Sequence, residues 1–177
     1  KSSLQIEKIT LIGQILQKNF FKSESILIME KALKLSKKYS APELAVRQLS
    51  FLMPHYSFVE PDQNKMVRLM KELDYYSKLY QSEIFVKKCN AIFSNMYVTT
   101  KGGFNQQQIK IMSDLVEKMQ DIKSKYTSNY IISFVNDLTF FYYQSIGDYK
   151  KGLEIAVQGL KENTALESKE LLGIYQS

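Results

Sequence analysis

Hydrophobic residues recur along most of the chain at steps of three and four positions. This spacing places apolar side chains on one face of an α-helix and is the main sequence signal of an amphipathic helix. Residues 4–18 show it first, with an apolar stripe that includes Ile6, Ile9 and Leu16. Residues 23–39 repeat the pattern after a short turn. We therefore expect the first 39 residues to form a helical hairpin.

Capping residues indicate where the next helices begin. Ser40 and Glu43 have the spacing of a capping box, and Pro42 suits the first helical turn because that position needs no backbone N–H. The third helix is thus predicted to run to about residue 58, and a fourth from Pro61 to Tyr80. The remaining predicted helices are separated by a Ser82 cap, a Gly102–Gly103 break with an Asn105–Gln108 cap, a start after Tyr126, a Gly147–Asp148 turn and a Thr164–Glu167 cap. This pattern predicts nine helices in one continuous domain over residues 1–177.

Three similar phrases, SKKYS, SKLYQ and KSKYT, close the second helix of successive predicted hairpins on Tyr39, Tyr80 and Tyr126. A unit of about 40 residues per helix pair is typical of an α-solenoid, in which each hairpin buries its apolar face against its neighbours. The predicted fold is therefore all-α, with about four antiparallel helical hairpins and an additional C-terminal helix.

Two stretches resemble the tetratricopeptide repeat family. Near the N-terminus the relevant residues are Ile12–Gly13, followed by Ser25, Met29 and Ala32, and near the C-terminus they are Gly147–Asp148–Tyr149 and Leu172–Gly173. The resemblance implies a right-handed α-solenoid whose first helices line a concave, protein-binding surface.

The middle of the chain departs from the family pattern. The tyrosine spacings are 41 and 46 residues, whereas the family repeat is about 34 residues long. Phe140 occupies a position where the family has a small residue, and Thr164 one where proline is common. The resemblance therefore covers about the first 40 and the last 45 residues, with similar architecture expected between them.

Composition favours a helical, water-soluble protein and does not favour nucleic-acid binding. Only 7 Gly and 3 Pro interrupt the helical pattern. The net charge is +6, but only Arg47 and Arg68 among the 24 basic residues are arginine, and lysine lacks the planar fork that reads phosphate and guanine. The lysines are spread around polar helix faces, so nucleic acid is not an expected partner.

The sequence carries no recognisable catalytic, metal or cofactor motif. His55 is the only histidine and Cys89 the only cysteine, so no histidine dyad and no multi-cysteine metal site is expected. Carboxylate pairs such as Asp114 and Glu117 lie among lysines and are interpreted as a solvated face. No stretch approaches the ~20 apolar residues of a membrane span. We predict a non-enzymatic, cofactor-free, cytoplasmic protein that does not insert into membranes.

Residues 130–143, YIISFVNDLTFFYY, carry six aromatic side chains around one helix. They indicate either a helix packed on several sides or a helix with one edge open to a partner. By the family resemblance, the concave surface receives Asp137, Phe141 and Gln144 from this helix, and Thr10, Gln14 and Lys18 from the first helix. An aromatic side chain flanked by polar groups can anchor a peptide.

The predicted function is a scaffold that binds a protein or peptide partner. The alternative is a sensor or regulatory domain of a larger bacterial signalling or transcription-regulator protein. The chain begins on Lys1 without a methionine, and we expect it to be a segment of a longer protein.

Overall fold

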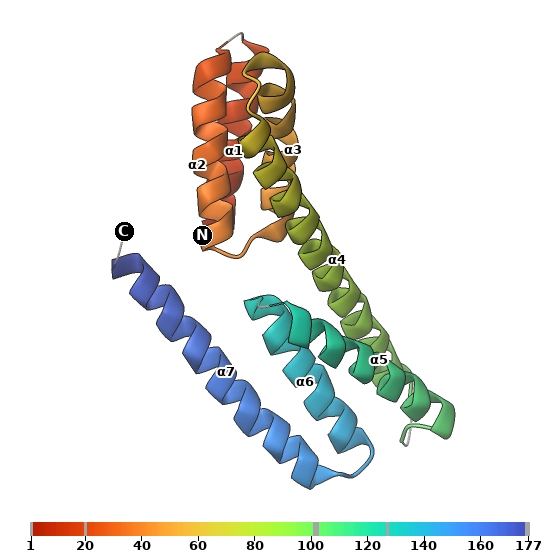
Figure 1. Cartoon of the computed structure of the whole chain (residues 1–177). Coiled ribbons are helices and arrows are strands. Elements are labelled where there is room, and N and C mark those ends of the chain that lie inside the picture. Colours follow the sequence, from red (N-terminus) through yellow and green to blue (C-terminus); the bar gives the residue numbers. More distant parts are fainter. Residues whose placement is uncertain (1, 20, 101–102, 127, 176–177) are drawn as a thin grey trace. The chain divides into compact units, whose positions relative to one another are not determined.

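The computed structural model describes residues 2–19, 21–100, 103–126 and 128–175, with side chains up to Thr164 (Figure 1). Within these residues all regular secondary structure is helical and no strand forms, which confirms the predicted all-α class. The helices are α1 (Ser2–Lys18), α2 (Lys22–Lys38), α3 (Pro42–Pro54), the π-helix η1 (His55–Val59), α4 (Gln63–Thr99), α5 (Gln106–Lys125), α6 (Asn129–Ser145) and α7 (Tyr149–Tyr175). The solenoid arrangement and its handedness stay predictions.

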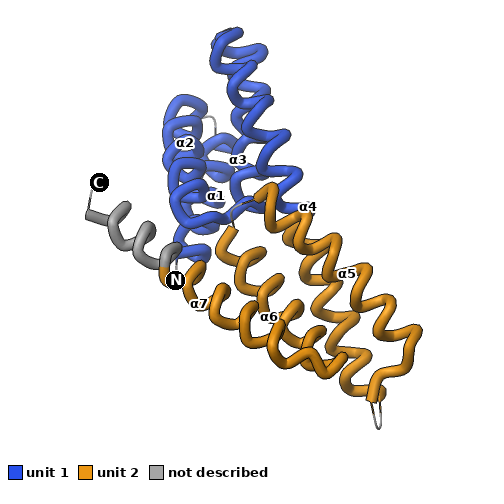
Figure 2. The backbone as a smooth tube through the Cα atoms, turned by 60° about the horizontal axis from the view of Figure 1, so that its bottom comes forward, with its two compact units in different colours: residues 1–81 blue, residues 82–177 orange. Residues whose placement is uncertain are grey.

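The chain divides into two compact units, Lys1–Gln81 and Ser82–Ser177, below called unit 1 and unit 2 (Figure 2). The sequence indicated one continuous body, because no flexible linker interrupts it. The boundary between the units falls inside α4, so helical sequence runs through it.

Two predicted helix breaks are wrong. α4 runs without interruption through Tyr80 and Ser82, and α7 runs through Thr164. Residues 63–99 contain neither glycine nor proline, and a serine or threonine can stay helical when its hydroxyl bonds back to the preceding turn. The Thr164 hydroxyl does so, donating to the Leu160 carbonyl at 2.8 Å. The described chain therefore has seven α-helices where nine were predicted.

Some of the predicted helix caps form and one does not. Asn105 and Gln108 form both bonds of a capping box, at 2.9 and 3.0 Å. Ser40 does not cap α3, because it adopts a left-handed backbone with φ 49° and Ala41 occupies the N-cap position without a side-chain bond. Asp148 accepts from the Lys151 backbone N–H at 3.1 Å, as expected for the start of α7. Lys101, Gly102 and Thr127, which the predicted breaks and caps included, lie outside the described residues.

Unit 1 is built around α2. The helix forms a hairpin with α1, and α3 packs against α2 and also contacts α1. The start of α4 joins them through Leu69, which is only 5% exposed. Gly13 allows α1 to approach α2 closely, since a Cβ there would lie 3.0 Å from the Met29 methyl carbon. The core side chains are Ile26, Met29, Leu33, Ala45, Leu49, Leu52, Tyr56 and Leu69.

A chain of buried polar side chains ties together the first three helices of unit 1, α1, α2 and α3. The Ser36 hydroxyl donates to Gln48 Oε1 at 2.7 Å, and Gln48 Nε2 donates to the Thr10 hydroxyl at 2.9 Å. Thr10 in turn donates to the Ile6 carbonyl at 2.9 Å. Each polar atom is satisfied, so this network fixes how α1, α2 and α3 pair without leaving a desolvated group.

α6 is the central helix of unit 2, packed between α5 and α7. Gly159 of α7 makes room for it, because a Cβ there would lie 3.2 Å from the Asn136 side chain. The large Phe140 side chain, unexpected from the repeat pattern, lies against Gly152, where a Cβ would meet the ring at an ordinary contact distance of 3.6 Å. The six aromatic residues of α6 are half-buried, as expected for a helix packed on several sides.

Candidate functional site

The predicted binding residues of α1 do not share one surface. Thr10 is 2% exposed and both donates and accepts in the unit 1 core, so its side chain cannot contact a partner. Gln14 is half-buried and Lys18 is exposed. The family mapping places Thr10 on a groove, whereas the packing of α1 against α3 buries it.

Two predicted residues of α6 come together in a groove of unit 2. Asp137 and Phe141 lie one helical turn apart and, with the C-terminal part of α4, line a cavity of about 400 Å³. Neither is fully buried. Gln144 is exposed near the end of α6 and does not line this cavity. We call the cavity the α4/α6 groove; its lining residues are Asn90, Phe93, Ser94, Tyr97, Val98, Asp137, Leu138 and Phe141.

Phe141 is the centre of an aromatic cluster in this groove. Its ring centroid lies 6.1 Å from that of Phe93, 5.7 Å from Tyr97 and 5.9 Å from Phe104. These separations are favourable for aromatic pairs. Phe93 is buried, but Tyr97 is 65% and Val98 is 78% exposed. The groove therefore combines a fixed aromatic floor with apolar surface that water still contacts.

Asp137 adds a negative charge to this apolar surface. Its carboxylate is exposed and has no hydrogen-bond or ion-pair partner among the described residues. Partial burial raises the pKa of this carboxyl above its usual value, because an apolar surrounding disfavours the charged form. A cation placed beside Asp137 would relieve that cost, so the groove suits an apolar group next to a positive charge.

Sequence reasoning missed the α4 side of the groove. Helical periodicity places Phe93 and Tyr97 on an apolar stripe of α4, but it gives no role to Asn90, Ser94 and Val98. The available signal is spacing, because Asn90, Ser94 and Val98 follow one another at four-residue steps on one helix face. Spacing alone does not predict that this face contacts α6, because α6 is far away in the sequence.

The residues with potential reactivity occupy structural positions. Cys89 is 1% exposed, and burial raises the pKa of its thiol to about 11, more than the opposing effects of its backbone hydrogen bond and of Lys118. Such a thiol is not a nucleophile at neutral pH. His55 is buried beside Tyr56, and its Nε2 lies 3.4 Å from the Glu60 carboxylate. In the described part of the chain, no three His, Cys, Asp or Glu residues gather where they could hold a metal ion.

A buried carboxylate anchors the start of α6. Glu83 on α4 is 7% exposed and accepts a hydrogen bond from the Ser128 hydroxyl at 2.6 Å. Ser128 is also the N-cap of α6. Burial raises the pKa of Glu83, and this effect exceeds the lowering by Ser128 and Lys87. Glu83 thus positions α6 at the cost of placing a charge in a poorly solvated site.

Replacing Glu83 by glutamine is expected to increase the free energy of unfolding at pH 7.5, by about 1 kcal/mol. The amide oxygen can still accept from Ser128, and no charge is buried. Because the folded-state pKa of Glu83 lies above the unfolded one, its stabilising contribution is complete at acidic pH and is lost as pH rises through the folded pKa. The gain of the variant should therefore shrink towards pH 4, as measured by urea denaturation at both pH values. Exposed Glu117→Gln is the control, and an equal gain in it would contradict the assignment.

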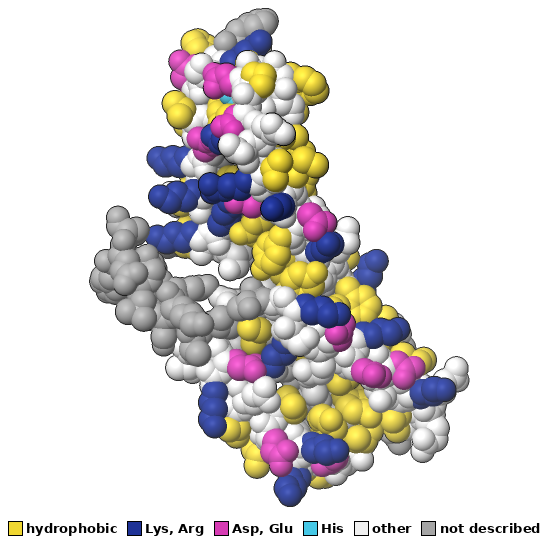
Figure 3. Space-filling view, in the orientation of Figure 1, with side chains coloured by type: hydrophobic (Ala, Val, Ile, Leu, Met, Phe, Trp, Pro, Cys, Tyr) yellow, Lys and Arg dark blue, Asp and Glu magenta, His cyan; other side chains and the backbone are white. Residues whose placement is uncertain are grey.

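Basic side chains are scattered on the face of the molecule in Figure 3, with acidic and apolar ones among them. The expectation that nucleic acid is not a partner stays a prediction.

Within the described residues, no helix combines the length and the apolar character that crossing a membrane requires. No family model, no curated protein and no solved structure matches this chain. The tetratricopeptide resemblance therefore stays a prediction from a few residues, and the proposed function depends on the α4/α6 groove itself.

Proposed function

We propose that this chain is a non-enzymatic binding module whose α4/α6 groove holds a peptide or helix of a partner protein. The partner segment carries an apolar side chain that contacts Phe141 and, close to it, a lysine or arginine that pairs with Asp137. The observation that carries the proposal is an unpaired carboxylate beside a half-buried aromatic cluster at a cavity of about 400 Å³.

The composition of the groove supports a polypeptide ligand. Aromatic anchors in a partly desolvated pocket supply most of the energy of protein interfaces. Tyr97 and Val98 offer exposed apolar surface that a partner can cover. A carboxylate at the edge adds orientation, because a like-charged segment would be repelled there. The fixed aromatic contacts mean that little side-chain entropy is lost on binding.

A peptide-display selection on the immobilised full chain tests this proposal. We expect the enriched peptides to place an apolar residue near a lysine or arginine. A labelled peptide from that set should bind Phe141→Ala at least about tenfold more weakly than the wild type, as measured by fluorescence anisotropy. Asp137→Asn should weaken binding by about three- to tenfold and reduce its dependence on salt.

A matched control lies on the same helix. Phe134 is also half-buried and stacks on Tyr130 at 4.4 Å, but it does not line the groove. Phe134→Ala should change the affinity by less than about twofold. The proposal would be overturned if no peptide were enriched, or if the selected peptide bound Phe141→Ala and the wild type equally well.

The alternative prediction, a sensor domain of a larger bacterial regulator, is compatible with the same groove. It concerns segments outside this chain, and the complete gene would test it by containing or lacking an adjacent DNA-binding or kinase domain.

A further inference from the structure

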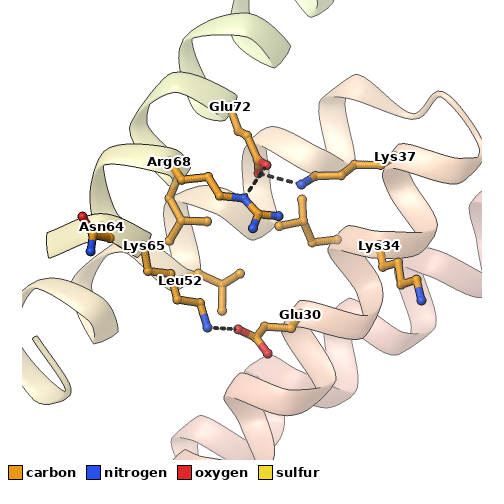
Figure 4. Close-up of a pocket in the computed structure, with 10 residues that line it drawn as sticks. Glu30, Lys34, Lys37, Leu52, Asn64, Lys65, Arg68 and Glu72 are labelled. Atoms are coloured by element: carbon orange, nitrogen blue, oxygen red, sulfur yellow. Dashed lines mark hydrogen bonds and ion pairs between the residues drawn. The ribbon is translucent and has the colours of Figure 1, made fainter. Parts of the chain in front are cut away.

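A second, larger groove lies in unit 1 between α2 and α4 (Figure 4). Its volume is about 760 Å³. α2 and α4 supply its charged walls, and Leu33, Leu52 and Leu69 lie beneath them. We call it the α2/α4 groove; its polar lining residues are Glu30, Lys34, Lys37, Asn64, Lys65, Arg68 and Glu72.

Ion pairs cross this groove at two places. Lys65 Nζ lies 2.6 Å from Glu30 Oε1, and Lys37 Nζ lies 2.6 Å from Glu72 Oε2. Each pair joins α4 to α2, as the dashed lines in Figure 4 show. Tyr56 also donates to Glu30, at 2.6 Å. Both carboxylates of the groove are therefore already neutralised by a lysine.

The pKa shifts of Glu30 and Lys65 agree with this charge pairing. Burial acts to raise its pKa, but the hydrogen bonds from Lys65 and Tyr56 outweigh burial and leave the pKa lowered. The pKa of Lys65 is correspondingly raised, because Glu30 and Tyr56 outweigh the effect of burial. Both groups are charged at neutral pH and compensate each other.

Arg68 and Lys34 remain as uncompensated cations of the groove. Arg68 uses only its Nε towards Glu72, at 3.3 Å, and Glu72 is already paired with Lys37. The two terminal nitrogens of Arg68 have no partner among the described residues, and Figure 4 shows its guanidinium between the two ion pairs. Lys34 has no ion pair in the described part of the chain and lies on the α2 rim, pointing away from them. The lining thus has four cations and two carboxylates.

We propose that the α2/α4 groove binds an acidic segment of a partner protein, with an aspartate or glutamate side chain of that segment on the terminal nitrogens of Arg68. The free end of a guanidinium can hold a carboxylate through two parallel N–H···O bonds. The flexible Lys34 side chain can change its rotamer, reach the bound segment and add a second cation. The two ion pairs tie the groove walls together before binding, and Glu72 orients the Arg68 guanidinium through its Nε.

A polypeptide fits the groove better than a nucleic acid. Only Arg68 and Lys34 carry uncompensated positive charge in the groove, whereas a nucleic acid brings a negative charge at every phosphate. A polypeptide can place a carboxylate at Arg68 and neutral or apolar residues beside Glu30 and Glu72. The Arg68 side chain is 76% exposed, so its bond to a carboxylate forms in contact with water and should weaken as the salt concentration rises.

The test uses the full chain and three labelled probes of equal length: a peptide of alternating leucine and glutamate, the same peptide with lysine for glutamate, and single-stranded DNA. We expect the glutamate peptide to bind and the lysine peptide not to bind in about 50 mM salt. The dissociation constant should rise with salt, as charge pairing predicts. In the Lys34→Ala/Arg68→Ala double variant it should rise at least about tenfold.

The control is Lys31→Ala/Lys71→Ala, which removes two exposed cations from the same two helices but outside the groove. It should change the dissociation constant by less than about twofold. Equal weakening in both double variants would overturn the proposal, because it would indicate non-specific attraction to a basic protein. Tighter binding of DNA than of the glutamate peptide would also overturn it. Neither result would affect the α4/α6 groove, which is tested by Phe141→Ala with a different peptide.

Discussion

Replacing Gln48 by alanine is expected to lower the free energy of unfolding of unit 1 by about 3 kcal/mol. Gln48 is fully buried and bonds both Ser36 and Thr10. Alanine would leave a cavity where three helices meet and would remove both hydrogen bonds. Urea denaturation followed by circular dichroism would measure the loss, analysed separately for each unit if two transitions appear.

Two further variants separate the effect of the cavity from the effect of the lost hydrogen bonds. Gln48→Leu keeps most of the volume, and Thr10 keeps its bond to the Ile6 carbonyl, so the loss should be smaller, about 1–2 kcal/mol. Arg47→Ala changes the neighbouring exposed residue and should cost less than about 0.5 kcal/mol. A loss in Gln48→Ala no larger than in Arg47→Ala would show that the polar network does not stabilise the fold.

Replacing Lys123 by alanine is expected to destabilise unit 2 by about 2 kcal/mol at neutral pH. Lys123 on α5 lies 2.6 Å from the Glu162 carboxylate on α7 and donates to Asn136 on α6 at 2.7 Å. Its side chain is only 12% exposed. The variant would leave Glu162 partly buried without its cation, although Asn136 and Gln158 would still donate to it.

This loss should depend on pH. Burial acts to raise the pKa of Glu162, but hydrogen bonds from Lys123, Asn136 and Gln158 outweigh it and leave the pKa lowered. A lowered folded-state pKa contributes stability above the unfolded pKa, and that contribution is lost as pH falls through the folded value. The difference between the wild type and Lys123→Ala should therefore narrow below about pH 4.

An exposed ion pair of the same helix serves as the control. Lys125 lies 2.6 Å from Asp121, but both side chains are more than half exposed. Lys125→Ala should cost less than about 0.5 kcal/mol, because water screens such a pair. Equal losses in Lys123→Ala and Lys125→Ala would contradict this prediction, because they would show that partial burial does not increase the contribution of the Lys123–Glu162 pair to the free energy of unfolding.

Local signals in the sequence predicted the features that depend on a few neighbouring residues. The capping box at Asn105 and Gln108 formed as expected, and so did the turn before α7, where Gly147 has φ 77°. In both cases the donor, the acceptor and the backbone angles belong to residues within one turn. The breaks at Ser82 and Thr164 failed because a hydroxyl residue is compatible with both a cap and a helix interior, and only the surrounding packing selects between them.

The candidate groove was predicted in part. Asp137 and Phe141, which the family resemblance places on one surface, both line the α4/α6 groove; that they contact a partner stays a prediction. Thr10 was misplaced, because its position on α1 was taken from the family pattern, whereas its hydroxyl meets Gln48 from α3. The residues from α4 were not assigned at all, since no pattern within that helix identifies which neighbour its apolar face will meet.

The sequence by itself determined the helical class, the apolar face of most helices and the chemistry of the capped turns, because these follow from periodicity and from bonds between near neighbours. Only the tertiary structure decided that Thr10 is core, that Phe141 lies beside Tyr97, and that Arg68 has a free end between two ion pairs. Periodicity states which residues share a helix face, but the partner of that face is selected by packing between segments far apart in the chain.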